Sequence, residues 1–229
     1  MDVVIEYAPL LARGTLVTVS LALLSLALAT MLGALGAAAR LSGGRIAHGA
    51  VFAYTTLVRG VPDLVLILLI YYGGQAGVNA VGQALGLDFI EVDQFLAGVL
   101  AIGFIYGAYL TETFRGAYLT VPKGQGDAAM ALGLSPLQRL WLVDLPQVIR
   151  FALPGYANVW QVLVKSTAVV SVIGLQDLVL LAGNAGRTVR EPFTFYFVVF
   201  CVYLGITAIS QAIFDRAEKR YARGFGDAR

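Results

Sequence analysis

The sequence predicts an all-α, polytopic membrane protein with about five transmembrane helices, in a single domain that covers residues 1–229. The first observation is composition: 59% of the residues are hydrophobic and only 13% are charged, whereas soluble domains carry about 25% charged residues. The second is a mean hydropathy of +0.78. The third is a series of apolar runs, each close to the length of about 20 residues that a spanning helix needs. The lipid bilayer is therefore the expected surrounding of the chain.

The apolar runs follow one another along the chain. They cover residues 14–39, about 51–82, 95 to about 113, about 151–174, and 193–214. The first run is uncharged throughout. The second contains Arg59 and Asp63 and the fourth contains Lys165, so these two are the less regular spans. Pro62 is expected to break the hydrogen-bond ladder of the second run, because proline has no backbone N–H to donate.

The distribution of lysine and arginine predicts the orientation of the chain, because cytoplasmic segments carry an excess of these residues. Five spans place the two termini on opposite sides. One side then receives most of the 16 basic residues: Arg40, Arg45, Arg59, Arg115, Lys123, Arg139, Arg150, Arg216, Lys219, Arg220, Arg223 and Arg229. The other side receives Arg13, Arg187 and Arg190. We therefore expect a cytoplasmic C-terminus, an external N-terminus and an external acidic loop at residues 88–93.

The segment between the third and fourth runs, residues 115–149, is long for a mere connector. It is expected to form two short helices. Pro122 suits the first turn of one helix, and Gly133 suits its C-terminal cap. Ser135 and Pro136 then begin a second helix, which Leu145-Pro146 would end. The residues alone leave two interpretations open: a hairpin that lies on the bilayer surface, or an element on which another protein docks.

The stretch "GDAAMALGLSPLQRLWLVDLPQ" resembles the cytoplasmic loop of bacterial ABC-importer permeases. The resemblance rests on Asp127-Ala128-Ala129, then Gly133, then Leu145-Pro146, with Asp127 where the family usually has Glu. Three further stretches resemble the polar amino-acid branch of the family: "YTTLVRGVPDLVLILLIYYG", "GFIYGAYLTETFRGAYLTVPKGQ" and "ALPGYANVWQVLVKSTAVVSVIGLQDL". Together they cover most of residues 54–178.

The resemblance implies the transmembrane domain of a type I ABC importer, with a coupling loop at about residues 116–149. It also implies three kinds of partner: a second permease subunit, which is a paralogue or a second copy, two cytoplasmic ATPase subunits, and a periplasmic binding protein. The expected location is the bacterial inner membrane. The expected substrates are polar and basic amino acids of the histidine, lysine, arginine and ornithine type, imported by alternating access. Opines, glutamine or another polar amino acid remain alternatives.

The residues also limit the functions that the chain can perform alone. No Gly-x-x-x-x-Gly-Lys-[Ser/Thr] segment is present to cradle nucleotide phosphates, and one histidine, His48, supports neither a metal site nor a nucleophile–base pair. We therefore expect no catalytic residue, no metal and no cofactor on this chain, with ATP and Mg²⁺ held by the partner ATPase. The net charge of +2 is too small to indicate nucleic acid. A stand-alone ion-coupled carrier and a scaffold protein are the competing hypotheses.

Two groups of polar residues in the second and third runs are candidates for the substrate pathway, because intramembrane charges indicate function. Asp63 either pairs locally with Arg59 at a kink or lines the pathway and attracts a cationic substrate. Tyr106 and Tyr109 either pack or line a cavity suited to an amino acid. Gly103 and Gly107, which accompany them, form a small-xxx-small pair that allows close helix approach.

The remaining candidates lie near the ends of the third run and along the fourth. Glu112 and Arg115 are three residues apart and are expected to form a structural ion pair on one helix. The polar side chains of the fourth run are Asn158, Gln161, Lys165, Ser166 and Thr167. They either form hydrogen bonds between helices or line the pathway opposite the partner permease. In the second case Lys165 needs neutralisation, for which Glu191 or Asp63 is available.

Overall fold

The computed structural model describes residues 2–42 and 44–222, and over these residues it is helical without any strand. The α-helices are α1 (Asp2–Glu6), α2 (Ala8–Ser42), α3 (Arg45–Gly60), α4 (Asp63–Ala84), α5 (Gln94–Thr120), α6 (Lys123–Ala131), α7 (Pro136–Arg139), α8 (Leu145–Ser166), α9 (Leu178–Thr188) and α10 (Pro192–Ala222). A π-helix (Leu140–Asp144) precedes α8, and a 3-10 helix (Thr167–Ile173) follows it. Five segments are long and apolar enough to cross a membrane, which confirms the predicted fold class and number of spans.

The core is built on the contact between α2 and α5. Gly103 and Gly107 bring the two helices together: a Cβ added at Gly103 would lie 2.5 Å from Leu28 Cδ2, and one added at Gly107 would lie 2.9 Å from Leu32 Cβ. The close approach predicted for this glycine pair is therefore confirmed. The buried apolar side chains of α5, α8 and the 3-10 helix then close the core around this contact, among them Ile102, Leu163 and Val170.

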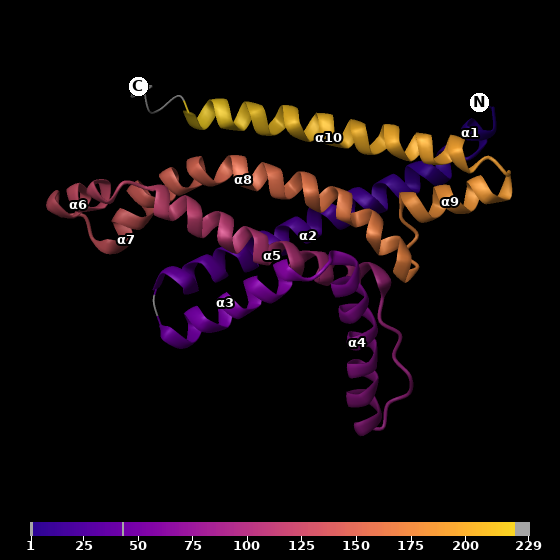
Figure 1. Ribbon diagram of the computed structural model, residues 1–229, viewed down its shortest axis with the longest axis horizontal. Coiled ribbons are helices and arrows are strands. Elements are labelled where there is room, and N and C mark those ends of the chain that lie inside the picture. The colour runs from indigo at the N-terminus through magenta and orange to yellow at the C-terminus, as the bar shows by residue number, and fades with distance from the viewer. Residues whose placement is uncertain (1, 43, 223–229) are drawn as a thin grey trace.

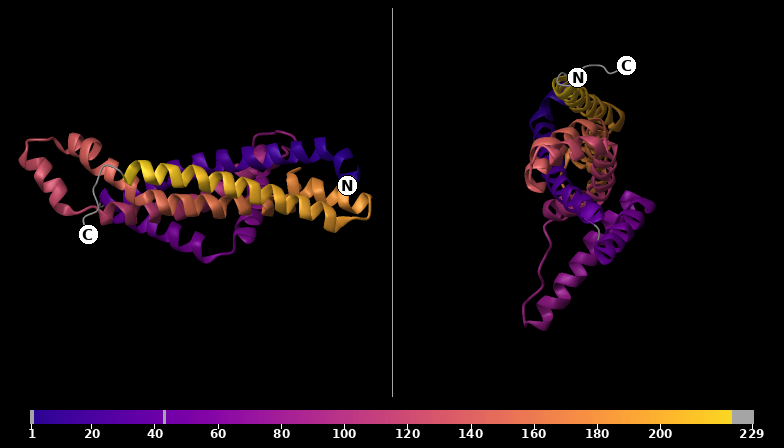
Figure 2. Two further views of the ribbon diagram at one scale, coloured as in Figure 1. Left: turned by 90° about the horizontal axis from the view of Figure 1, so that it is seen from above. Right: turned by 90° about the vertical axis from the view of Figure 1, so that its left-hand side faces the viewer.

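The second apolar run is not one helix. The chain breaks at Val61 and Pro62, so that α3 ends at Gly60 and α4 begins at Asp63. α3 packs back along α2 and α5, whereas α4 leaves the bundle at a steep angle (Figures 1 and 2). The predicted single segment is therefore wrong. The break at Pro62 was anticipated, but the sequence did not show how far the chain turns there.

Apart from α4, the longer helices run roughly along one axis (Figure 1). The predicted charge distribution places most of the basic residues toward one end of this axis. The segment α6–α7 and the C-terminal end of α10 lie at one end of the molecule, while α1 and α9 lie at the other (Figure 1). The ends of the described chain therefore lie at opposite ends of the molecule (Figure 1). Arg59 is an exception to the predicted charge distribution, because it lies at the end of α3 and stacks on Tyr109 of α5 instead of reaching the α6–α7 end. Arg223 and Arg229 lie outside the described residues.

The fourth run has more structure around it than the sequence predicts. Leu145 and Pro146 do not end a helix: Pro146 lies in the first turn of α8, where its missing N–H is tolerated. At the other end, the 3-10 helix stops at Gly174, which has φ +90°, and the additional helix α9 follows. The Asp177 side chain caps α9 by accepting a hydrogen bond from Leu180 N at 2.9 Å.

Candidate functional site

The segment between α5 and α8 folds into a helical hairpin, here defined as α6 and α7 with the turn between them. The turn is closed by two backbone bonds, from Gly133 N to Met130 O at 3.0 Å and from Leu134 N to Ala129 O at 3.1 Å. Gly133 has φ +84°, a conformation that side-chain-bearing residues rarely adopt. Ser135 caps α7 through a reciprocal capping box with Gln138, and Pro136 follows it. The predicted positions of Gly133, Ser135 and Pro136 are confirmed.

The hairpin projects beyond the ends of the bundle helices (Figure 2). Exposed apolar side chains lie on it and directly after it. Leu132 is 84% exposed and Trp141, just after α7, is 62% exposed. Asp127 and Ala128 are exposed, so another surface can approach them, whereas Ala129 is buried inside the hairpin. The predicted run of three motif residues is thus split between the surface and the interior.

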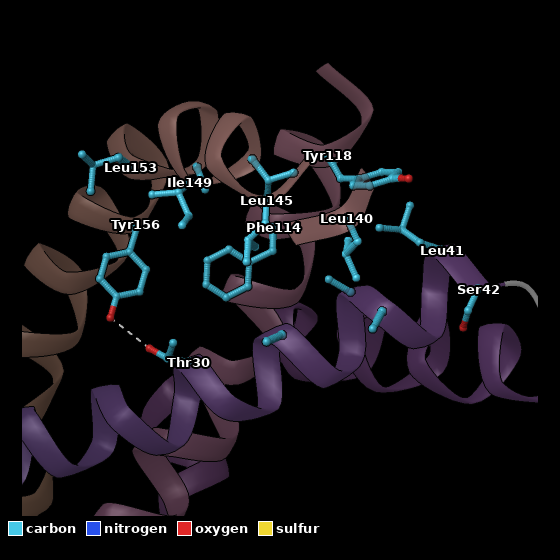
Figure 3. A pocket seen from close by; sticks show the side chains of 15 residues that line it. Thr30, Leu41, Ser42, Phe114, Tyr118, Leu140, Leu145, Ile149, Leu153 and Tyr156 are labelled. Carbon is cyan, nitrogen blue, oxygen red and sulfur yellow. Dashed lines mark hydrogen bonds between the residues drawn. The ribbon is translucent and has the colours of Figure 1, made fainter. Parts of the chain in front are cut away.

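The hairpin is tied to α8 by the π-helix and by one ion pair. Arg139 Nε lies 3.1 Å from Asp144 Oδ2, and the Arg139 guanidinium lies directly over Gly126, where a side chain would collide with it. From Pro136 to Ser166 the chain continues from α7 through the π-helix into α8 without a coil segment. Pro146 is exposed, and Leu145 points into the space between α2 and α8 (Figure 3). The hairpin is therefore joined to the fourth candidate span without an intervening loop.

Three of the candidate pathway residues meet in one cluster, the Asp63 network, which consists of Asp63, Tyr106 and Ser166. Asp63 Oδ2 accepts from Tyr106 Oη at 2.7 Å and from Ser166 Oγ at 2.9 Å, and the two hydroxyl oxygens lie 2.5 Å apart. Tyr106 is buried and Asp63 is half-buried. The network joins the start of α4, the middle of α5 and the end of α8.

The Asp63 network borders an aromatic pair. The rings of Tyr106 and Tyr109 stack with centroids 5.5 Å apart, and the Arg59 guanidinium lies 5.5 Å from the centre of the Tyr109 ring. Asp63 and Arg59 form no salt bridge in the described chain. The predicted local Arg59–Asp63 pair is therefore wrong, because each side chain turns to α5 instead. Asp63, Arg59 and the two tyrosine rings therefore form one polar cluster.

The other polar residues of the fourth run do not join this cluster. We define the polar row as Asn158, Gln161 and Lys165. Asn158 and Lys165 are exposed, and Gln161 Nε2 reaches Thr207 O of α10 at 3.5 Å. Thr167 is buried and turns to α10, where its hydroxyl lies 3.1 Å from Tyr203 Oη. The polar residues of the fourth run, for which the sequence predicts a single path, therefore lie in separate groups.

Lys165 forms no salt bridge in the part of the chain that the structure describes. Neither suggested counter-ion is available to it. The Asp63 carboxylate is taken up by Tyr106 and Ser166, and the Glu191 carboxylate accepts from Thr194 at 3.3 Å.

The predicted ion pair between Glu112 and Arg115 is confirmed, at 2.8 Å between Oε2 and Nη2. The sequence did not indicate that Glu112 also contacts residues of two other helices. Arg40 of α2 lies 3.2 Å from Glu112 Oε1, and Thr55 of α3 donates to the same oxygen at 3.4 Å. We define the Glu112 network as Arg40, Thr55, Glu112 and Arg115. It links three helices on the hairpin side of the Asp63 network, and no spacing along the chain indicates a contact between residues so far apart.

No group of three or more His, Cys, Asp or Glu side chains that could hold a metal ion occurs within residues 2–42 and 44–222. The polar clusters of this part of the chain are instead suited to hydrogen bonding and to contacts between helices.

Comparison with known proteins agrees with this architecture. The family described as "Binding-protein-dependent transport system inner membrane component" matches residues 29–223. The histidine/lysine/arginine/ornithine transport system permease protein HisQ of Salmonella typhimurium is 47% identical over 95% of this chain and 96% of its own length. The octopine transport system permease protein OccQ of Rhizobium radiobacter is 40% identical over 93% of this chain and 90% of its own length.

A solved structure supports the same assignment. The crystal structure of an amino acid ABC transporter with histidines matches 95% of this chain and 96% of that chain, with a TM-score of 0.81 and 28% sequence identity. The chain is a multi-pass transport subunit and not an enzyme, and it belongs to the family of inner membrane components of binding-protein-dependent transport systems.

Proposed function

We propose that this permease serves an ATP-driven importer of basic amino acids of the histidine, lysine, arginine and ornithine type. The identity to HisQ of Salmonella typhimurium, at 47%, supports this substrate class. The opines are the second candidate, because OccQ of Rhizobium radiobacter is 40% identical. Octopine and the basic amino acids share a cationic side chain, so the same acidic contact would serve both.

The proposed complex contains this chain, a second permease subunit, two cytoplasmic ATPase subunits and a periplasmic binding protein. The hairpin end, which carries most of the basic residues, faces the cytoplasm, and the N-terminus faces the periplasm. The chain itself holds no nucleotide: ATP and Mg²⁺ stay on the ATPase partner. The binding protein delivers the substrate to the opposite end, near α9.

The observation that carries the mechanism is the uninterrupted path from the hairpin to the Asp63 network. The hairpin offers exposed Asp127, Ala128 and Leu132 to the ATPase. α7, the π-helix and α8 then continue to Ser166, and α8 alone extends over roughly 33 Å at 1.5 Å per residue. When the ATPase pair closes on ATP, the hairpin follows it and α8 tilts. Ser166 then moves relative to Asp63 and Tyr106, which opens the pathway to the other side.

In this mechanism the Asp63 network holds the closed pathway and receives the substrate. Asp63 provides the negative charge that attracts a cationic side chain, and Tyr106 and Ser166 keep its carboxylate hydrogen-bonded when no substrate is present. The stacked Tyr109 ring offers a flat apolar surface beside it. The Glu112 network acts as a structural tie between α2, α3 and α5, on which the moving α8 turns.

A substitution at Gly133 tests the coupling role. Gly133 has open space around it but φ +84°, so Gly133→Val strains the turn by about 1–2 kcal/mol without a steric clash. Gly116, in α5 and outside the hairpin, also has open space and an ordinary helical conformation, which makes Gly116→Val the matched control. We expect Gly133→Val to lower substrate uptake and to uncouple or release the ATPase, while Gly116→Val transports normally. Full uptake and a normal ATPase content for Gly133→Val would argue against coupling through the hairpin.

The substrate class needs a separate test. The binding protein that works with this permease should be purified and titrated with arginine, lysine, histidine, ornithine, octopine, glutamine and glutamate. Tightest binding of one of the first four supports the basic amino-acid assignment. Tightest binding of octopine supports the second candidate, and binding of neutral or acidic amino acids alone contradicts both.

A further inference from the structure

A cavity of about 640 Å³ lies between α2, α5 and the start of α8, at the hairpin end of the membrane helices. Almost all of its lining is apolar: Ala34, Ala37, Ala38, Leu41, Phe114, Leu140, Leu145, Val148, Ile149, Ala152 and Leu153. Thr30 and Tyr156 close one end with a hydrogen bond of 2.9 Å, and Ser42 and Tyr118 lie at the other end (Figure 3). The volume lies within the range of about 300–1,000 Å³ that is usual for ligand sites.

The cavity is separate from the Asp63 network, because the two lie at different heights along α8. Tyr156 is the last residue of α8 that lines the cavity, and Ser166 of the network lies ten residues further along the helix. Ten residues correspond to roughly 15 Å at 1.5 Å per residue.

The cavity is open to the surroundings of the membrane helices. Leu140 is 42% exposed and Ile149 is 38% exposed, and Ala34 and Ala38 of α2 are exposed as well. Leu35, beside them on α2, adds a further exposed apolar side chain. From Thr30 to Ser42 the cavity follows α2 for roughly 18 Å, which is close to the depth of about 15 Å for one leaflet of the hydrocarbon core.

Two basic residues lie close in sequence to the end of the cavity that Ser42 and Tyr118 line. Arg45 follows shortly after Ser42 in the chain, and Lys123 follows shortly after Tyr118; both are exposed. Neither forms a salt bridge with another described residue, whereas Glu112, the acid nearest along α5, is already paired with Arg40 and Arg115. This end therefore suits a negatively charged group at the membrane surface.

From this combination we propose that the cavity binds one acyl chain of an anionic phospholipid, whose headgroup lies at the Ser42 and Tyr118 end, near Arg45 and Lys123. The acyl chain of the lipid enters the cavity between α2 and α8 from the leaflet on the hairpin side. Leu140 of the π-helix and Leu145 of α8 form part of the wall, so the lipid contacts the connection through which the hairpin is joined to the membrane. The site is a lipid site of this subunit that is distinct from the Asp63 network.

A photoreactive lipid tests the proposal on the complete transporter. The complex that contains this chain is reconstituted in bilayers with a trace of phosphatidylglycerol that carries a diazirine in one acyl chain. After illumination, labelled peptides are identified by mass spectrometry. We expect labels to concentrate on the cavity lining of α2 and α8, well above those on the exposed surface of α10. With a phosphatidylcholine probe the labelling of the cavity should fall by roughly five- to thirty-fold, as expected when one or two cations attract the headgroup.

Two double variants of matched geometry separate the cavity from general contact with lipid. Ala34→Leu/Ala38→Leu fills the cavity from exposed positions four residues apart, and Ala76→Leu/Ala80→Leu adds the same bulk to exposed positions four residues apart on α4. The first should lose most of the cavity labelling, and the second should keep it. Labelling that is uniform over the membrane surface overturns the proposal. An unlabelled cavity in a well-folded complex overturns it too, since the partner permease would then cover the cavity.

Discussion

The Asp63 network makes a sharp prediction for Tyr106→Phe, a change that removes one hydroxyl group and leaves the ring. The Tyr106 side chain is 2% exposed, so no water replaces the lost hydroxyl, and its hydrogen bond to Asp63 is 2.7 Å long. A hydrogen bond to a charged group contributes about 1.5–3 kcal/mol. At about 2–4 °C per kcal/mol for a chain of this size, the melting temperature should fall by roughly 3–12 °C.

Tyr109→Phe is the matched control, because this residue lies one helical turn away in α5. The Tyr109 hydroxyl has no hydrogen-bond partner among the described residues, and both of its ring contacts persist in phenylalanine. Its melting temperature should stay within about 2 °C of wild type, as for other substitutions that break no specific contact. Purified protein in a single detergent, followed by thermal unfolding, provides the comparison. Equal melting temperatures for the two variants would refute the claim that the network stabilises the junction of α4, α5 and α8.

Three further predictions concern packing, charge and pH. Gly103→Ala forces a Cβ against Leu28 and should be about 1–3 kcal/mol less stable than Gly116→Ala, a change in the same helix with open space, and thermal unfolding of both variants checks this. Glu112→Gln leaves partly buried Arg40 without the counter-ion that it has among the described residues and should lower stability by about 1.5–3 kcal/mol; a loss below about 0.5 kcal/mol would contradict the network. Burial raises the pKa of the Asp177 carboxyl to about 6, so its stabilising contribution is complete below about pH 4 and is lost as the pH rises through 6. Between pH 4 and 7, wild type should therefore lose stability relative to Asp177→Asn, and a constant difference in melting temperature over that range would contradict the raised pKa.

The elements that the sequence predicted well are those set by local chemistry. Gly133, Ser135 and Pro136 dictate caps through their own backbone preferences, so the hairpin could be placed without any tertiary information. The spans followed from the length of apolar runs, and the Glu112–Arg115 pair followed from helical spacing.

The elements that could not be predicted depend on contacts between distant parts of the chain. Pro62 indicated a break, but the angle between α3 and α4 is set by packing on α5. The sequence suggested Arg59 as a partner of Asp63 because the two residues lie four positions apart. In the fold, Asp63 instead accepts hydrogen bonds from Tyr106 and Ser166. α9 is short and follows a glycine-ended 3-10 helix, so it carried no apolar run long enough to be noticed.

In the proposed mechanism, the permease receives the energy for transport at its hairpin. Transport by purified components tests this dependence most directly. The complex of this chain with its partner permease and ATPase is reconstituted in liposomes, with Mg-ATP inside and the binding protein with labelled arginine outside, the cytoplasmic side facing the lumen. We predict uptake that requires both ATP and the binding protein, and that falls sharply when the permease carries Gly133→Val. Equal uptake by this chain alone, without ATP, would contradict the account.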